Sequence, residues 1–297
     1  MTAPRDHQAS APGRGPARLA TITARLTTRD LELTGLLHEH KVLTTDQIAM
    51  LLFGQPSAAR RRMLILHQLG VADRFRPWAR TGTAPWHYVL GLAGAAVLAA
   101  ARDTTPTGLG YSRSRALAVA YSLQLAHLSG INTFFSVLAA TARASGGTAR
   151  LAAWWSEQRC AQQWHGLARP DAYGRWQDHG ADVDFFLEYD TGTERPATRV
   201  TAKLDAYTRL TTATGITTPV LFWFPTPRRE QNIRAALPRR YPVPVATASG
   251  PLELGETGPA GPVWLPAGSD GHRLRLAGLA ALWPAQPTGT QDNNADR

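Results

Sequence analysis

Five residues whose side chains could do chemistry gather in one stretch of the sequence. Glu188 and Asp190 close the apolar run VDFFLEYD, Asp171 precedes it in RPDAYG, and Lys203 and Tyr207 stand four apart in TAKLDAY. Side chains alternate across a strand, so Glu188 and Asp190 share a face. Carboxylates at the end of a buried strand are costly unless they are protonated, paired or bound to a cation. The stretch therefore predicts a divalent-metal site.

The elements around these residues would have to bring them together. Residues 183–189 read as a buried strand, and Asp171 lies on a preceding extended segment that reaches the same point if the two strands pair. Thr193 can cap a helix with Pro196 in its first turn. Residues four apart lie one above the other on such a helix.

The predicted roles can be stated residue by residue. We expect the catalytic set Asp171, Glu188, Lys203 and Tyr207, and the metal ligands Asp171, Glu188, Asp190 and Glu157. Oxygen ligands suit Mg²⁺ or Mn²⁺. The metal would polarise a phosphate and activate water, while Lys203 would stabilise the charge of the transition state.

The order of predicted elements supports such a site. A helix at 125–144 and a strand at 151–156 precede it; a strand at 219–224, a helix at 228–237 and a strand at 243–247 follow it. This order resembles the restriction-endonuclease-like PD-(D/E)xK nuclease superfamily, with Pro170-Asp171 as the PD and Glu188 as the second acid. The resemblance implies an α+β or α/β fold: a three-layer core in which helices flank a mixed sheet.

One position departs from that pattern. Two residues after Glu188 the superfamily has lysine, and this chain has Asp190. If Lys203 supplies the lysine from the helix, the site is a migrated variant. If it does not, the site is catalytically dead. The chain has only two lysines, Lys41 and Lys203, among 32 basic residues, which favours a role for Lys203 modestly.

Composition points to a polyanionic partner. The chain has 297 residues and a net charge of +10, which favours nucleic acid; an arginine-rich composition from a GC-rich genome is the alternative. With a single cysteine, Cys160, the chain can form no internal disulfide, which fits a reducing cytoplasm. The most apolar run, 89–101, is too short to span a bilayer.

The N-terminal part predicts a winged helix-turn-helix. Helices capped by Thr27 or Thr28, by Thr44 or Thr45 and by Ser57 precede two strands around a Thr-Gly turn. The third helix of this motif enters the major groove. We expect DNA contacts from Arg60, Arg61, Arg62, Arg74, Arg76 and Arg80, and we interpret Trp78 and Trp86 as core aromatics of the wing. The alternative is a helical domain that packs on a partner protein.

These patterns divide the chain. We expect disorder at 1–20, a winged helix at 21–102, a linker at 103–113, a nuclease-like domain at 114–283 and a disordered tail at 284–297.

Taken together, the blocks LTTRDLELTGLL, TTDQIAMLLF, WWSEQ, RPDAYG, FFLEYDTGTE and KLDAY resemble the replication-relaxation family of actinobacterial plasmid and integrative-element proteins. The resemblance covers about residues 25–245. It implies a DNA-binding protein of plasmid or mobile-element replication and relaxation, and leaves cleavage open.

Two function classes remain. The first is a metal-dependent DNA nuclease or nickase; the second is a catalytically inactive DNA-binding initiator or regulator, favoured by Asp190. A ligand-sensing transcription factor has little support. The chain has no Gly-Lys pair for a nucleotide-binding loop, no His-hydrophobic-His pair of a rolling-circle relaxase and no GxSxG. Expected partners are double-stranded DNA and either a second copy of the chain or other replication and transfer proteins, without a membrane or a nucleotide cofactor.

Overall fold

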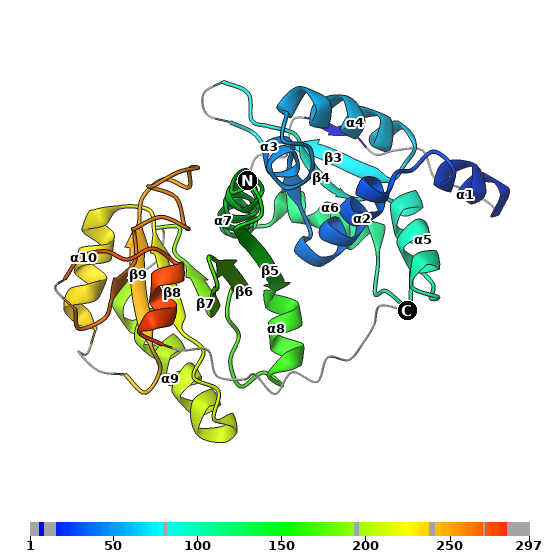
Figure 1. The fold of residues 1–297 in the computed structure, drawn as a ribbon. Coiled ribbons are helices and arrows are strands. Elements are labelled where there is room, and N and C mark those ends of the chain that lie inside the picture. Colours follow the sequence, from blue (N-terminus) through cyan, green and yellow to red (C-terminus); the bar gives the residue numbers. More distant parts are fainter. Residues whose placement is uncertain are drawn as a thin grey trace. The chain divides into compact units, whose positions relative to one another are not determined.

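The computed structural model describes residues 6–8, 16–79, 82–192, 196–237, 241–269 and 271–283 (Figure 1). The chain divides into two compact units, and the boundary between Ser136 and Val137 lies inside helix α7 (Leu125–Ala144). Residues 103–136 thus belong to the first unit, whereas the sequence placed a linker and the start of the second domain there. The Tyr111 hydroxyl, for example, donates to the Leu90 carbonyl at 3.0 Å. The predicted mixed α+β class is confirmed.

Three consecutive helical segments open the main part of the first unit. They are α2 (Thr28–His40), α3 (Thr45–Ile48) with its π-helical continuation η1 (Ala49–Phe53), and α4 (Pro56–Gln68). Capping boxes start the first two, at Thr27 and Thr44. The predicted Ser57 cap is wrong, because α4 already begins at Pro56, whose fixed φ suits the first helical position.

A small antiparallel sheet completes this unit beside the helices (Figure 1). Its order is β1-β3-β4-β2, with β1 (Asp6–Gln8), β2 (Leu43–Thr44), β3 (Ala72–Arg76) and β4 (His87–Leu90). The remaining elements are α1 (Pro16–Thr23), α5 (Leu92–Ala101), α6 (Arg113–Ala118) and η2 (Val119–Tyr121). Strand β1 and residues 16–20 of helix α1 lie in the stretch 1–20 that was predicted to be disordered, and β1 pairs with β3.

Two buried aspartates tie elements of the first unit together. Asp30, on α2, is 1% exposed and accepts two hydrogen bonds from Arg62 of α4. Asp73, on β3, is fully buried and pairs with Arg113 of α6. A buried carboxylate without such a partner would be strongly destabilising.

The second unit is built on a mixed sheet in the order β10-β9-β8-β7-β6-β5. Its strands are β5 (Ala149–Ser156), β6 (Ala172–Asp178), β7 (Ala181–Tyr189), β8 (Val220–Phe224), β9 (Val245–Ser249) and β10 (Leu265–Pro266). Strands β5, β6 and β7 form an antiparallel meander, and β8 and β9 continue it in parallel to β7. Ala172 pairs with Leu187, so Asp171 lies across from Glu188.

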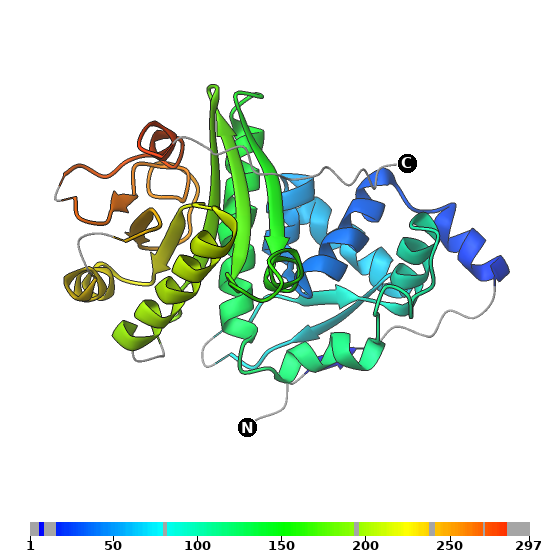
Figure 2. The same ribbon diagram turned by 90° about the horizontal axis from the view of Figure 1, so that it is seen from below.

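Helices cover one face of this sheet and the C-terminal segment covers the other. The helices are α8 (Glu157–Gln163), α9 (Pro196–Thr214) and α10 (Pro227–Ala236). Figure 2 shows α9 running alongside the strands, and its Leu204 and Leu210 pack with Phe186 and Phe222. On the opposite face the short helix η3 (Ala277–Ala281) contacts β7, and the ring of Trp264 meets Trp223. The sheet therefore has two covered faces.

Helix α7 is long and apolar enough to cross a membrane by length and composition. In the structure three of its apolar side chains, Phe134, Phe135 and Leu138, are completely buried. Its buried Asn132 donates to the carbonyl of Val42 at 2.6 Å. Buried polar groups with protein partners are typical of a folded interior.

Candidate functional site

Four predicted side chains meet at one end of the β6–β7 pair. The Lys203 ammonium donates to Asp171 Oδ1 at 3.0 Å and also to Glu188 Oε2. The Tyr207 hydroxyl donates to the other oxygen of Glu188. The site thus joins the residue before β6, the end of β7 and one face of α9. Its outermost members in the sequence, Asp171 and Tyr207, are 36 positions apart.

Local geometry explains the meeting. Antiparallel pairing brings Asp171 beside Glu188, and the Tyr189 amide fixes it by donating to Asp171 Oδ2 at 2.8 Å. Lys203 and Tyr207 lie one helical turn apart and reach the two oxygens of a single carboxylate.

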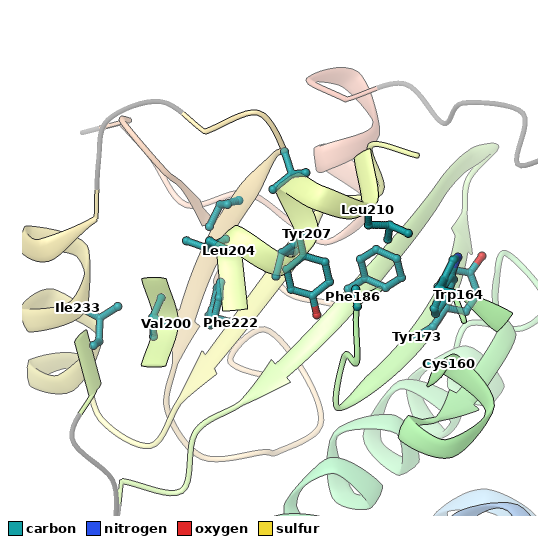
Figure 3. Packing of buried hydrophobic residues seen from close by; sticks show 14 of the residues in the cluster. Cys160, Trp164, Tyr173, Phe186, Val200, Leu204, Tyr207, Leu210, Phe222 and Ile233 are labelled. Atoms are coloured by element: carbon teal, nitrogen blue, oxygen red, sulfur yellow. The ribbon is translucent and has the colours of Figure 1, made fainter. Parts of the chain in front are cut away.

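Tyr207 of the site also belongs to a cluster of buried aromatic and aliphatic side chains (Figure 3). The ring of Tyr207 stacks on Phe186 with centroids 5.2 Å apart, and the rings of Trp164 and Phe186 are nearly perpendicular with centroids 4.7 Å apart. Glu188 is 3% exposed, while Asp171 and Lys203 are 11% and 28% exposed. The lysine and Asp171 thus form the side of the site that solvent reaches.

Burial and charge shift the protonation of this group. Burial, joined by the negative charge of Asp171, raises the pKa of Glu188 to about 8, against the opposing effects of Lys203 and Tyr207. Burial alone would lower the pKa of Lys203, but the two carboxylates outweigh it and raise that pKa. One ammonium faces two acids, so the folded site favours one proton on Glu188 near neutral pH.

The four predicted metal ligands have different partners in the structure. Asp190 follows the end of β7 and its carboxylate accepts two hydrogen bonds from Arg229 at the start of α10, both at 2.9 Å. Glu157 is 57% exposed and lies 3.9 Å from Arg169. Across the described ranges no group of three or more His, Cys, Asp or Glu side chains could hold a metal ion. Asp171 and Glu188 are the two carboxylates that share the Lys203 ammonium.

Arg229 is a residue that the sequence did not single out. Its pairing with Asp190 fixes the chain directly after Glu188, where Asp190 also accepts a hydrogen bond from the Gly192 amide. The only sequence signal is its place in the first turn of the predicted helix, which does not reveal a partner 39 positions away.

The predicted DNA-contacting arginines have different surroundings. On α4, Arg60 and Arg61 are exposed, whereas Arg62 is engaged by Asp30 and by the Arg25 carbonyl. Arg62 is therefore an internal tie in this structure. Two further predicted arginines, Arg74 and Arg76, lie on β3 of the β3–β4 hairpin. The guanidinium group of each lies 4.1 Å from the centre of the Trp86 ring. The predicted contact Arg80 falls outside the described residues.

The proton on Glu188 should make stability depend on pH. Its folded pKa of about 8 exceeds its ordinary 4.5, so the unfolding free energy should fall as pH rises between these values. Denaturant unfolding at several pH values should show this fall in the wild type, and Glu188→Gln should remove it. Glu253→Gln, at an exposed position of the same unit, is the control. Identical pH dependence in wild type and Glu188→Gln would contradict the assignment.

Comparison with known proteins identifies the family. The model of the replication-relaxation family matches residues 35–225. No curated protein and no solved structure matches the chain. The matched range includes the helices α3 and α4, the hairpin and all four residues of the site. The chain belongs to the replication-relaxation family.

Proposed function

We propose that this protein binds double-stranded DNA through its first unit and cuts one DNA strand with the side chains of Asp171, Glu188 and Lys203. The proposed role is in the replication or relaxation of a plasmid or other mobile element. Family membership supports the role in replication or relaxation. The observation that carries the cleavage proposal is the meeting of two carboxylates and one lysine from three separate elements.

The first unit has the order of elements of a winged helix-turn-helix. Helix α2, strand β2, helices α3 and α4, and the hairpin β3–β4 follow one another, and β4 lies between β2 and β3. In that motif the third helix, here α4, lies in the major groove. The exposed Arg60 and Arg61 would then contact phosphates or base edges, and Arg74 and Arg76 would approach the backbone.

The second unit has the order expected of a PD-(D/E)xK core. Three antiparallel strands precede α9, and β8, α10 and β9 follow it. The lysine that is missing two positions after Glu188 would be supplied by Lys203, because its ammonium contacts both acids. This geometry favours the migrated form of the site over a site that lacks its lysine.

The residues present fit a hard divalent cation. Mg²⁺ keeps several waters and is often held by one or two carboxylates together with substrate phosphate. Asp171 and Glu188 would supply the carboxylates of such a site. When bound, Mg²⁺ or Mn²⁺ supplies phosphate polarisation and activation of water. Lys203 would stabilise the charge that develops on the phosphate, and Tyr207 would hold Glu188 in place.

A catalytically inactive DNA-binding initiator or regulator is the second candidate. The observation that favours it is that both carboxylates already have a partner: Lys203 bridges Asp171 and Glu188, and Glu188 is almost fully buried. In that case the same group would hold α9 to the sheet. For either function we propose a cytoplasmic location, with a second copy or other replication and transfer proteins as partners.

Plasmid nicking separates the two candidates. Supercoiled plasmid with Mn²⁺ should be nicked by wild type and left intact by Glu188→Ala/Lys203→Ala. Removing Glu188 together with Lys203 avoids leaving a buried glutamate without its ammonium, and melting curves would check that the variant is folded. Asp205→Ala, which removes an exposed acid from the same helix, should nick as wild type does. Binding of the plasmid without nicking by wild type would favour the inactive regulator.

The arginines of α4 should separate into two classes. Arg60→Gln and Arg61→Gln should weaken duplex binding, and each lost phosphate contact should lower the salt slope by about one. Arg62→Gln should instead lower the unfolding free energy by about 2 kcal/mol, because it removes charged hydrogen bonds from buried Asp30. Unchanged DNA binding by the first two variants would move the DNA surface away from α4.

A further inference from the structure

The solvent-exposed stripe of α4 carries more than arginines. Ser57, Arg60, Arg61, Leu64, Ile65 and Gln68 are the exposed positions from Ser57 to the helix end. Leu64 is 44% exposed and Ile65 is 37% exposed. Two large aliphatic side chains thus follow two arginines along the same surface.

These two side chains are not needed to fill the core. The opposite side of α4 already buries Ala59, Met63 and Leu66 completely. Leu64 and Ile65 are adjacent, so they form one apolar spot instead of singly scattered residues.

The charge beside this spot indicates its partner. Helix α4 contains no acidic residue, and the chain carries a net charge of +10. The fitting partner has a polyanionic rim and an apolar feature between its anions. The major groove of duplex DNA has both, because phosphates line its edges and each thymine projects a 5-methyl group into it.

We propose that Leu64 and Ile65 contact thymine methyl groups in the major groove, so that the DNA preferred by this protein carries thymines opposite the second half of α4. This rests on the proposed DNA binding through α4 and adds the base that is read. A helix fits the groove, and apolar side chains recognise thymine by contact with its methyl group. Arg60 and Arg61, one turn earlier, would hold the helix at the phosphates or at guanine.

Uracil substitution tests the methyl contact directly. The probes are two short duplexes of alternating adenine and thymine, or adenine and deoxyuridine, which differ in the 5-methyl group. Wild type should bind the thymine duplex about fourfold tighter for each methyl group it buries. Leu64→Ala/Ile65→Ala should bind both duplexes equally. Leu123→Ala, at a leucine of the first unit that is 92% exposed, should keep the wild-type preference.

The outcomes are distinct. Equal binding of both duplexes by wild type would overturn the thymine contact and leave DNA binding standing. A preference that persists in Leu64→Ala/Ile65→Ala would mean that altered duplex flexibility or other residues cause it, which also overturns the proposal. Absence of binding to either duplex would overturn the proposed DNA binding as well. If sedimentation showed wild type as a dimer and the double variant as a monomer, with no thymine preference in either, the spot would be a self-interface and the proposal wrong.

Discussion

One ammonium group shared by two carboxylates organises the second unit. Lys203 of α9 reaches Asp171 before β6 and Glu188 at the end of β7, so it joins the helix layer to two adjacent strands. A buried charge is tolerated only with a partner, and here each charge depends on the others. Tyr207 and the Tyr189 amide then complete the hydrogen bonding of the acids. The same interactions therefore fix the position of α9 on the sheet and form the candidate site.

This arrangement has a chemical consequence. Without a proton on Glu188 the group would hold one positive and two negative charges, and its solvent-accessible side is made of Asp171 and Lys203. A divalent cation would compensate the remaining negative charge, and a phosphate would meet the lysine. The same imbalance explains why Glu188 binds its proton more tightly than an ordinary glutamate. In a nuclease site a divalent cation would replace the proton on Glu188, whereas in a purely structural ion pair the proton would stay.

The sequence predicted the parts of this site that depend on periodicity. Alternation placed Glu188 at the end of an apolar strand, and the four-residue spacing placed Lys203 and Tyr207 on one helix face. Pairing of β6 with β7 supplied Asp171, as the hypothesis required. The helix at 125–144 coincides with α7, and the order of strands matches the prediction.

Partners from distant segments were beyond prediction. No spacing rule links Asp190 to Arg229 or Arg62 to Asp30, because tertiary packing decides which charges meet. For the same reason the sequence did not reveal that the carboxylates of Asp190 and Glu157 lie beside Arg229 and Arg169. Strand β1 was missed because its stabilisation comes from the exposed edge of β3 and not from its own three residues.

Binding of Mn²⁺, followed by electron paramagnetic resonance, would test whether Asp171 and Glu188 hold a divalent cation. We expect a bound ion in wild type and in Asp190→Asn, because the Asp190 side chain is already paired with Arg229, and loss of that ion in Asp171→Asn. Binding should tighten as pH rises through about 8, because Glu188 must release its proton to become a ligand. Equal binding by wild type and Asp171→Asn, or no binding by either, would mean that Asp171 is not a ligand of a metal ion.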